Sequence, residues 1–352
     1  MKNTPLELGT QKIGKLLMQY AIPSIIATTA AALYSITDSI FIGHGVGPLA
    51  ISGLAITFPL MNLSAALGTM VGVGASALLS MRLGQKDYDS ANKIVGNVFL
   101  MILIISVIFT IPTLIFLKPI LYFFGASEDT LPYAYDFMFI ILSGTVITHL
   151  YFSFNALIRA SGQPLKSMTA TIMTVVVNVI LNPLFIFGFG WGMRGSALAT
   201  IISQVVVLVW QLHLFNRRDS FLKIQRQSLR FNSKIAFDSI AIGLSPFLMN
   251  AASSVIVIII NQGLLKYGGD MAVGAFGIVN RIAMLFVMIV IGLNQGMQPI
   301  AGYNYGARLY PRVTEVLKKS VIIATLIMSV GFLTAQLMPH QIVSMFTSDL
   351  EL

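Results

Sequence analysis

The chain has 352 residues, of which 56% are apolar and only 10% are charged, and its formal net charge is +9. Its mean hydropathy is +0.83. Soluble domains carry roughly 25% charged residues, so this composition excludes a water-soluble globular protein and indicates a lipid environment. The absence of cysteine excludes a disulfide framework and a thiol-ligated metal, and the four histidines are scattered without ligand spacing.

A helix that crosses a bilayer needs about 20 mostly apolar residues. This rule predicts nine spans, at 16–42, 50–80, 94–117, 131–158, 167–190, 195–215, 238–265, 272–302 and 319–339. When alternate connections are assigned to opposite sides, 18 of the 22 Lys and Arg residues fall on the side of the N-terminus. This bias predicts that the N-terminus and the basic connections are cytoplasmic. The positive charge is therefore a topology feature, and we predict no nucleic-acid partner.

The first span holds one carboxylate, Asp38, and neither this span nor the next has another Asp, Glu, Lys or Arg. A charge inside a span costs about 2.5–3.5 kcal/mol on insertion scales, so it is a functional candidate by default. Tyr34 lies one turn earlier on the same helix face. Pro23 lacks an N–H and marks a place where this span can bend. The alternative for Asp38 is a neutral acid that holds helices together by hydrogen bonds.

The fifth and sixth spans carry polar residues that could join this acid. Asn178 and Asn182 are one turn apart on one face of the fifth span, and Thr200 lies in the sixth. They can meet Tyr34 and Asp38 only if the first six spans form one bundle. Amides and hydroxyls also serve as plain bridges between membrane helices, which remains the structural alternative.

The segment that follows, 216–237, is basic with interleaved apolar residues, which favours a linker lying on anionic lipid head groups. A regulatory or partner-binding role is the alternative. The spans beyond it have polar residues of their own, and a candidate C-terminal cavity is formed by Asn261, Asn280, Arg281 and Gln295. Apart from Asp238 at the first position of the seventh span, no acid lies in a span of this half, so Arg281 needs a partner elsewhere or extends to an interface.

The sequence also repeats itself. Residues 72–84 align with 294–306, which lie 222 positions later, and 120–127 align with 342–349. Such a repeat predicts two homologous helix bundles related by an axis along the membrane normal. The second copy is expected to lack its last three helices of twelve. The predicted all-α membrane protein thus divides into an N-terminal segment, an N-lobe, a linker and an incomplete C-lobe, at 1–15, 16–215, 216–237 and 238–352.

Enzyme chemistry has little support in the sequence. It contains no nucleophile beside a base, no metal-ligand cluster and no phosphate-binding glycine loop. No polar domain outside the membrane could host a reaction. We therefore predict a protein that is not an enzyme and has no cofactor.

Four stretches resemble the multidrug and toxic compound extrusion (MATE) family: LYSITDSIFIGHGVGPLAISGLAITFP, LGTMVGVGASALLSMRLGQ, NVILNPLFIFG and NQGMQPIAGYNYGA. The resemblance covers essentially the whole chain from about Leu8 and is closest to the bacterial and archaeal branch with a first-helix aspartate. It implies two six-helix bundles around a central cavity. It also implies export of cationic or amphipathic drugs against an inward flow of protons or sodium ions.

The resemblance assigns a cation-coupling site to five positions, which are Tyr34, Asp38, Asn178, Asn182 and Thr200. It also assigns the bending of the first helix to Pro23. One position departs from the family pattern, because Asn182 stands where the branch has a second aspartate. With that charge gone, we expect H⁺ as the coupling ion, bound at Asp38, and Na⁺ at the same site as the alternative. The seventh span also lacks the glutamate that another branch uses in its C-lobe.

We thus expect a monomeric antiporter of the bacterial cytoplasmic (inner) membrane, with drugs or organic cations and membrane lipid as its partners. Protonation of Asp38 would bend the first helix near Pro23 and expel the drug. One rival is a lipid-linked saccharide flippase of the same superfamily, which would be expected to place more basic residues in its cavity. A passive channel is a second rival, although paired repeats argue for two alternating states.

Overall fold

The structure is a computed structural model. It describes residues 7–217, 222–223 and 228–338, and between 254 and 282 only the side chains of Ile256, Ile259, Ile260, Gly263, Tyr267, Phe276, Val279 and Asn280. Every regular element in these ranges is a helix. Eight helical segments are long and apolar enough to cross a membrane, or nine if one bent pair counts as a single span. The predicted all-α integral membrane protein with about nine spans is confirmed.

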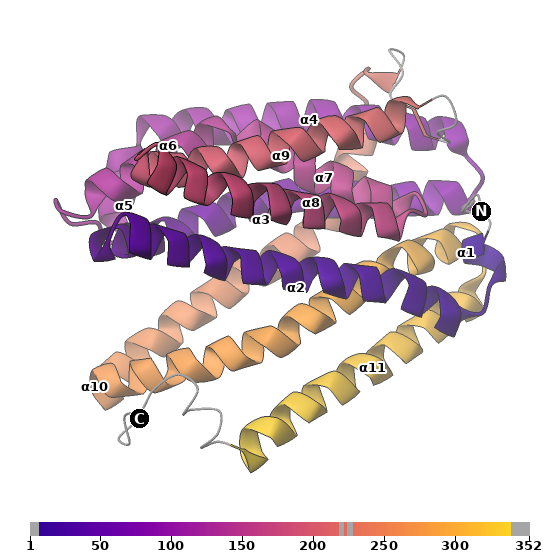
Figure 1. Cartoon of the computed structure of the whole chain (residues 1–352). Helices are drawn as coiled ribbons and strands as arrows, with labels where there is room; N and C mark the ends of the chain where they lie inside the picture. Colours follow the sequence, from indigo (N-terminus) through magenta and orange to yellow (C-terminus); the bar gives the residue numbers. More distant parts are fainter. Residues whose placement is uncertain (1–6, 218–221, 224–227, 339–352) are drawn as a thin grey trace.

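A first group of helices, here called the N-lobe, packs side by side in Figure 1. It follows the short helix α1 (Glu7–Thr10) and comprises α2 (Ile13–Gly45), α3 (Pro48–Gly84), α4 (Tyr88–Ile115), α5 (Leu117–Phe123), α6 (Leu131–Ser143), α7 (Thr145–Ala160), α8 (Pro164–Pro183), the π-helix η1 (Leu184–Gly188) and α9 (Gly192–Asn216). The residues at the first turn determine where several of these helices begin. Pro48 and Pro164 occupy first-turn positions, where a missing N–H is harmless. Asp87 caps α4 by accepting a 3.1 Å hydrogen bond from the Ser90 N–H.

The fourth predicted span, 131–158, is a broken helix in the structure. Its two parts, α6 and α7, meet at an angle of 57°. Gly144 lies between them, and a Cβ atom there would collide with the side chain of Ile201 on α9. The close approach of α9 therefore requires glycine at the bend, which sequence periodicity alone does not reveal.

A second group, here called the C-lobe, consists of α10 (Ser233–Gly306) and α11 (Tyr310–Leu337). The sequence predicts two spans with a connection at 266–271, whereas the structure assigns one continuous helix. This helix must reverse, because Gly243 packs on Met70 while Gln298 donates a 3.1 Å hydrogen bond to the carbonyl of Val73. In a straight helix those two α10 residues would be about 80 Å apart. In Figure 1 the two arms of α10, 233–253 and 283–306, both lead away from α3 and come together where the chain reverses.

The lobes touch backbone to backbone at two crossings of α3 with α10. At the first, a Cβ on Gly74 would collide with the carbonyl oxygen of Ser239. At the second, a Cβ on Gly84 would meet the carbonyl oxygen of Tyr303, and one on Gly306 would meet that of Met81. Small residues let membrane helices approach this closely. Both crossings depend on glycine, since the obstructing atoms belong to backbone.

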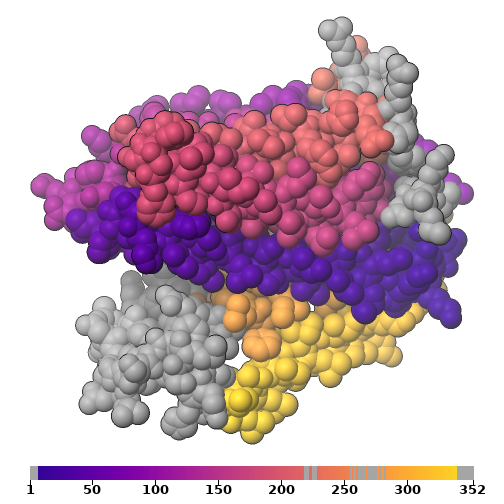
Figure 2. Space-filling model, in the orientation of Figure 1, coloured from indigo at the N-terminus to yellow at the C-terminus, as the bar shows by residue number. Residues whose placement is uncertain are grey.

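These contacts lie toward one end of the molecule, here called the basic end, which carries α1 and the connections 85–87, 161–163 and 307–309. On α2, contact with α10 reaches from Ala21, against Gly296, to Thr28, whose hydroxyl donates to the Met288 carbonyl at 3.3 Å. Farther along α2, Leu33 and Ile40 are about half exposed. Figures 1 and 2 show α2 as an indigo band from which α11 separates toward the other end. The lobes therefore meet at the basic end and part at the opposite, far end.

One arginine ties the start of the chain to the C-lobe. The Nη2 of Arg312 donates to the backbone carbonyls of Leu8 at 3.1 Å and Gln11 at 2.6 Å. Its Nε donates to the side-chain oxygen of Asn304 at 2.8 Å, and Asn304 in turn donates to the Leu8 carbonyl at 3.0 Å. The segment before α2 is thus held by the beginning of α11.

Candidate functional site

The N-lobe brings together three pairs of polar residues, each pair one helical turn apart on its own helix. They are Tyr34 and Asp38 on α2, Asn178 and Asn182 on α8, and Ser196 and Thr200 on α9. Side chains at i and i+4 share a helix face, so the three pairs meet as two stacked layers. The structure therefore unites all five residues to which the sequence assigns the cation site, and it adds Ser196.

The layer nearer the far end is centred on Asp38. Its Oδ1 accepts a hydrogen bond from the side-chain amide of Asn182 and another, of 2.9 Å, from the hydroxyl of Ser196. Asp38 is only 9% exposed, and the other two side chains are fully buried. Within the described residues, Oδ2 accepts no hydrogen bond. One carboxylate oxygen is thus anchored, and the other is available to a proton or a cation.

The second layer joins a phenol, an amide and a hydroxyl. The Tyr34 and Thr200 oxygens are 3.0 Å apart, and Asn178 donates to both, at 3.1 Å and 3.2 Å. These contacts connect α2, α8 and α9 at one level. They also place the Tyr34 oxygen one turn from the carboxylate.

Two amide oxygens in the cluster lack partners. The Oδ1 atoms of Asn178 and Asn182 are buried and accept no hydrogen bond from the described part of the chain. An acceptor left in this state costs about 1–3 kcal/mol. Together with the Asp38 carboxylate they form a set of hard oxygen ligands with one formal negative charge. By composition, this set can take a proton on the acid or a monovalent cation among the oxygens.

A cavity of about 570 Å³ lies beside the cluster. Its wall includes Tyr34, Asp38 and Thr200, and polar groups farther along it are Thr148 and Gln204, joined by a 2.6 Å hydrogen bond. The rest is mostly apolar, with the aromatic rings of Phe58, Phe137 and Phe152. The volume is typical of pockets for drug-sized molecules. Asp38 is the one charged residue among those lining it.

A buried histidine adjoins this cavity. The Nε2 of His149 lies 2.8 Å from the carbonyl oxygen of Ser64, and its Nδ1 lies 2.9 Å from the hydroxyl of Ser106. Because a carbonyl can only accept, Nε2 carries the proton and Nδ1 accepts from the serine. Both ring nitrogens are satisfied, so the residue is suited to tie α3, α4 and α7 together. This role of His149 is not evident from the sequence, in which the four histidines are scattered.

The remaining predicted residues fall into two groups. Pro23 is buried within α2, which stays a single helix here. Asn280 and Gln295 are half-buried on α10, and within the described residues no hydrogen bond links them to the N-lobe cluster. The side chains of Asn261 and Arg281 lie outside the described residues. The candidate C-lobe cavity therefore stays a prediction.

Ser196 is the site residue that sequence reasoning missed. It stands four positions before Thr200, the same spacing that links the pairs on α2 and α8. That spacing was the available clue. Hydroxyls in membrane helices commonly bond back to their own helix, which makes serine a weak predictor of a site.

Comparison with known proteins agrees with this architecture. A family model described as MatE matches residues 23–184 and 234–352. The multidrug export protein MepA of Staphylococcus haemolyticus is 28% identical over 337 residues, which cover 96% of this chain and 74% of that protein. MepA of Staphylococcus aureus is likewise 28% identical, over 95% of this chain and 74% of its own length.

Solved structures give the same result. A crystal structure of MATE in the bent conformation is 25% identical with a TM-score of 0.92, covering 98% of this chain and 77% of that one. A MOP superfamily transporter from Pyrococcus furiosus is 25% identical with a TM-score of 0.91, covering 99% of this chain and 77% of its own. With its family match, its helical layout and its polar cluster, this chain belongs to the MatE family.

Proposed function

We propose that the protein is a secondary active antiporter that exports cationic or amphipathic compounds across the bacterial cytoplasmic membrane in exchange for H⁺. Its N-terminus and basic end face the cytoplasm, in keeping with the distribution of Lys and Arg. The relatives named multidrug export proteins support the substrate class. The work of such a protein is transport and not catalysis.

The observation that carries this proposal is the single acid on the wall of the N-lobe cavity. Asp38 is the only charged residue that lines a space of about 570 Å³ with aromatic and aliphatic walls. One buried negative charge in such a wall favours an organic cation with apolar substituents. The same lining disfavours a lipid-linked saccharide flippase, because a pyrophosphate head group would require basic residues there.

Exchange follows if proton and drug compete for this acid. A proton on Oδ2 neutralises Asp38 and removes the reason for a cation to stay, whereas the ionised form holds the drug. The parting of the lobes at the far end gives the cavity a route to the outside, where protons enter and drug leaves. Each ligand then needs only to favour a different state of the two lobes.

Pro23 is well placed for the accompanying movement of α2. It lies where α2 packs on the second arm of α10, between Ala21 and Thr28, and the half of α2 beyond it is largely exposed. The missing backbone hydrogen bond lowers the cost of bending there. Neutralised Asp38 would accept weaker hydrogen bonds from Asn182 and Ser196, which would let the outer half of α2 repack.

Na⁺ is the alternative coupling ion. Because Asn182 is neutral, the site has only the one formal negative charge of Asp38, which favours a proton. The unpaired oxygens of Asn178 and Asn182 favour a cation that seeks several oxygen ligands. Both ions would act at the same place, so the choice between them is one of chemistry and not of location.

The proposal can be tested with the protein in proteoliposomes and a fluorescent organic cation such as ethidium. A pH gradient and a Na⁺ gradient are imposed separately, and uphill movement of ethidium is measured. We expect the pH gradient alone to drive transport. Transport driven by Na⁺ without a pH difference would overturn the proton assignment. Transport driven by neither, or single-channel currents, would overturn the antiporter.

A further inference from the structure

The described parts of the segment between the two lobes are seated on α4. Leu222 and Ser228 are only 2% and 4% exposed. A Cβ atom on Gly96 would collide with the carbonyl oxygen of Ser228, so this close approach requires glycine. The backbone N–H of Lys223 donates to the side-chain oxygen of Asn92 at 2.8 Å. A segment that the sequence places on lipid head groups is therefore held, in these parts, by the N-lobe.

One buried side chain fixes the last residues before α10. The side-chain amide of Asn97, which is 1% exposed, donates to the carbonyl of Arg230 at 3.1 Å. The side-chain oxygen of Asn97 accepts from the backbone N–H of Asn232 at 2.7 Å. Asn232 in turn caps α10, because its side-chain oxygen accepts from the N–H groups of Lys234 at 3.0 Å and Ile235 at 3.2 Å. The backbone just before α10 is thus fixed against α4.

A cavity of about 450 Å³ lies at this junction, and it is here called the linker pocket. The described residues that line it are Lys93, Asn97, Arg230, Phe231 and Asn232. Two of them are cations and none is an acid. Lys93 also pairs with the exposed Asp89 at 2.6 Å, whereas no carboxylate among the described residues pairs with Arg230. The positive end of the α10 dipole, at its cap Asn232, adds to the charge of the two side chains.

The lining of the linker pocket fits a phosphate group that is attached to an apolar molecule. Guanidinium and ammonium groups bind phosphate oxygens by charge-assisted hydrogen bonds. Phe231 and the neighbouring Leu229 are 54% and 37% exposed, so apolar surface lies beside the two cations. Lys93 is five residues from the start of α4, about 8 Å along a spanning helix, which is a suitable depth for a head group. An anionic phospholipid combines these features.

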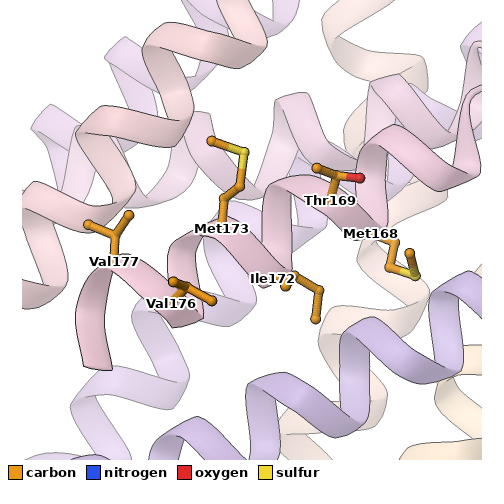
Figure 3. Close-up of a pocket in the computed structure, with 6 residues that line it drawn as sticks. All are labelled: Met168, Thr169, Ile172, Met173, Val176 and Val177. Atoms are coloured by element: carbon orange, nitrogen blue, oxygen red, sulfur yellow. The ribbon is translucent and has the colours of Figure 1, made fainter. Parts of the chain in front are cut away.

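A hollow of the opposite character lies along α8. Figure 3 shows six residues of this one helix around a space of about 270 Å³, and Thr169 is the one polar residue among them. Its hydroxyl donates to the carbonyl of Leu165 at 2.9 Å, so the donor is used within the helix. A surface of this kind can contact acyl chains but has no charge with which to distinguish head groups. The linker pocket has two.

We propose that the linker pocket binds the phosphate group of an anionic phospholipid of the cytoplasmic leaflet. Lys93 belongs to the N-lobe, and Arg230 belongs to the segment that leads into α10. One phosphate between them joins α4 to the start of the C-lobe. Inorganic phosphate has the same charge chemistry, but Phe231 and Leu229 offer it nothing, so the occupant is the lipid. The choice of leaflet rests on the proposed orientation, and the binding itself is independent of drug and coupling ion.

The test measures lipid binding to the purified full chain by native mass spectrometry. The probes are phosphatidylglycerol, phosphatidylcholine with the same acyl chains, and inorganic phosphate as a competitor. The variant Lys93→Gln with Arg230→Gln removes both cations of the pocket. Lys166→Gln with Lys318→Gln is the matched control, because it removes the same charge from exposed positions on the cytoplasmic side.

We expect the unmodified protein to bind phosphatidylglycerol at least about tenfold more tightly than phosphatidylcholine. The pocket variant should lose this preference and the control should keep it. No preference in the unmodified protein, or equal preferences in the two double variants, would overturn the site. Displacement of phosphatidylglycerol by inorganic phosphate at the lipid's own concentration would overturn the lipid as the occupant.

A second measurement needs no variant. In nanodiscs, hydrogen exchange of the backbone amides of 228–232 should be at least about threefold slower with phosphatidylglycerol than with phosphatidylcholine. Exchange in the connection 161–163, which lies at the same end, should not change. Equal exchange of 228–232 in both lipids would contradict the proposal. Neither measurement uses ethidium or an ion gradient, so failure of the lipid site and failure of the proposed antiport are separate results.

Discussion

The hydroxyl of Ser196 donates a 2.9 Å hydrogen bond to Oδ1 of Asp38, the same oxygen that accepts from Asn182. Two neutral donors converge on one carboxylate oxygen. The arrangement fixes the orientation of the acid and leaves Oδ2 without a donor among the described residues. A carboxylic acid in place of Asn182 could also donate a hydrogen bond to Asp38, but only in its protonated form. Asn182 and Ser196 keep their donors at every pH.

Replacement of Ser196 by alanine should weaken drug binding. A hydrogen bond to a charged group contributes about 1.5–3 kcal/mol, and its loss destabilises the ionised Asp38 that holds a cationic drug. We expect the dissociation constant of ethidium for the purified protein to rise roughly tenfold or more. Ser196→Thr retains the hydroxyl and serves as the control. Equal affinity in the alanine variant would show that Ser196 does not support the acid.

Asp38→Asn should abolish transport driven by a pH gradient and leave insertion into the membrane intact. The amide is nearly the same size as the acid but cannot exchange a proton, so the site stays permanently neutral. Proteoliposome transport and the yield of folded protein are the measurements. Asp89→Asn is a suitable control, because its exposed carboxylate on α4 lies outside the cluster and pairs with Lys93, at 2.6 Å. Normal pH-driven transport by Asp38→Asn would remove this acid from the mechanism.

Asn182→Asp should move the site toward sodium. The change places a second carboxylate beside Asp38 and raises the formal charge of the oxygen cluster from −1 to −2. We expect the affinity for Na⁺, measured by calorimetry on purified protein, to increase at least about tenfold, or roughly 1.4 kcal/mol. Asn62→Asp adds the same charge elsewhere on the cavity wall and controls for a general electrostatic effect. Similar gains in both variants would argue against a specific ion site.

Gly74→Ala should loosen the contact between the lobes. The new Cβ would overlap the backbone oxygen of Ser239, which has no rotamer to change. Overpacking of this kind typically lowers the free energy of unfolding by about 1–3 kcal/mol. We expect a lower unfolding temperature and faster hydrogen exchange in the first arm of α10. Gly14→Ala is the control, since its Cβ would lie 3.7 Å from the flexible end of Lys319. Equal stability of the two variants would contradict the crossing.

Arg312→Lys should free the segment before α2. A lysine cannot reproduce a fork that reaches two carbonyls and one amide oxygen, although it keeps the charge. The expected loss is about 1–3 kcal/mol of local stability, visible as faster hydrogen exchange at Leu8 and Gln11. Lys318→Arg, on an exposed position of the same helix, should have no such effect. Unchanged exchange in Arg312→Lys would show that the N-terminal segment is held by other contacts.

Most of the fold could be predicted because a lipid solvent leaves few choices. Span length located the helices of both lobes, with boundaries that differ by up to nine residues at the start of α11, which the sequence predicts at 319. It did not reveal the bend at Gly144, where the side chain of Ile201 on a distant helix leaves no room for a Cβ atom. It also separated α10 into two spans, in agreement with the two candidate spans Ser233–Ser253 and Ala283–Gly306, although it predicted a non-helical connection near 266–271. The backbone there remains helical while the chain reverses.

The site residues could be predicted where a side chain is energetically unfavourable inside a membrane span. A carboxylate or an amide pair in a membrane span requires a partner, which made Asp38, Asn178 and Asn182 conspicuous. Serine carries no such requirement. Ser203, on the same helix as Ser196, donates to its own Ala199 carbonyl at 2.6 Å. The sequence cannot separate these two serines, since the difference lies in which of them faces α2.

The hydrogen bonds from Arg312 to the carbonyls of Leu8 and Gln11 have a mechanical consequence. Those carbonyls immediately precede α2, and Asp38 lies 25 residues after its first residue, a distance of about 38 Å along a continuous helix. A helix is stiff over that length. When the C-lobe shifts at the basic end, it displaces the near end of α2, and the displacement reaches the acid through the backbone itself. Bending at Pro23 would reduce it, so the stiffness of that turn affects how strongly a shift of the C-lobe displaces Asp38.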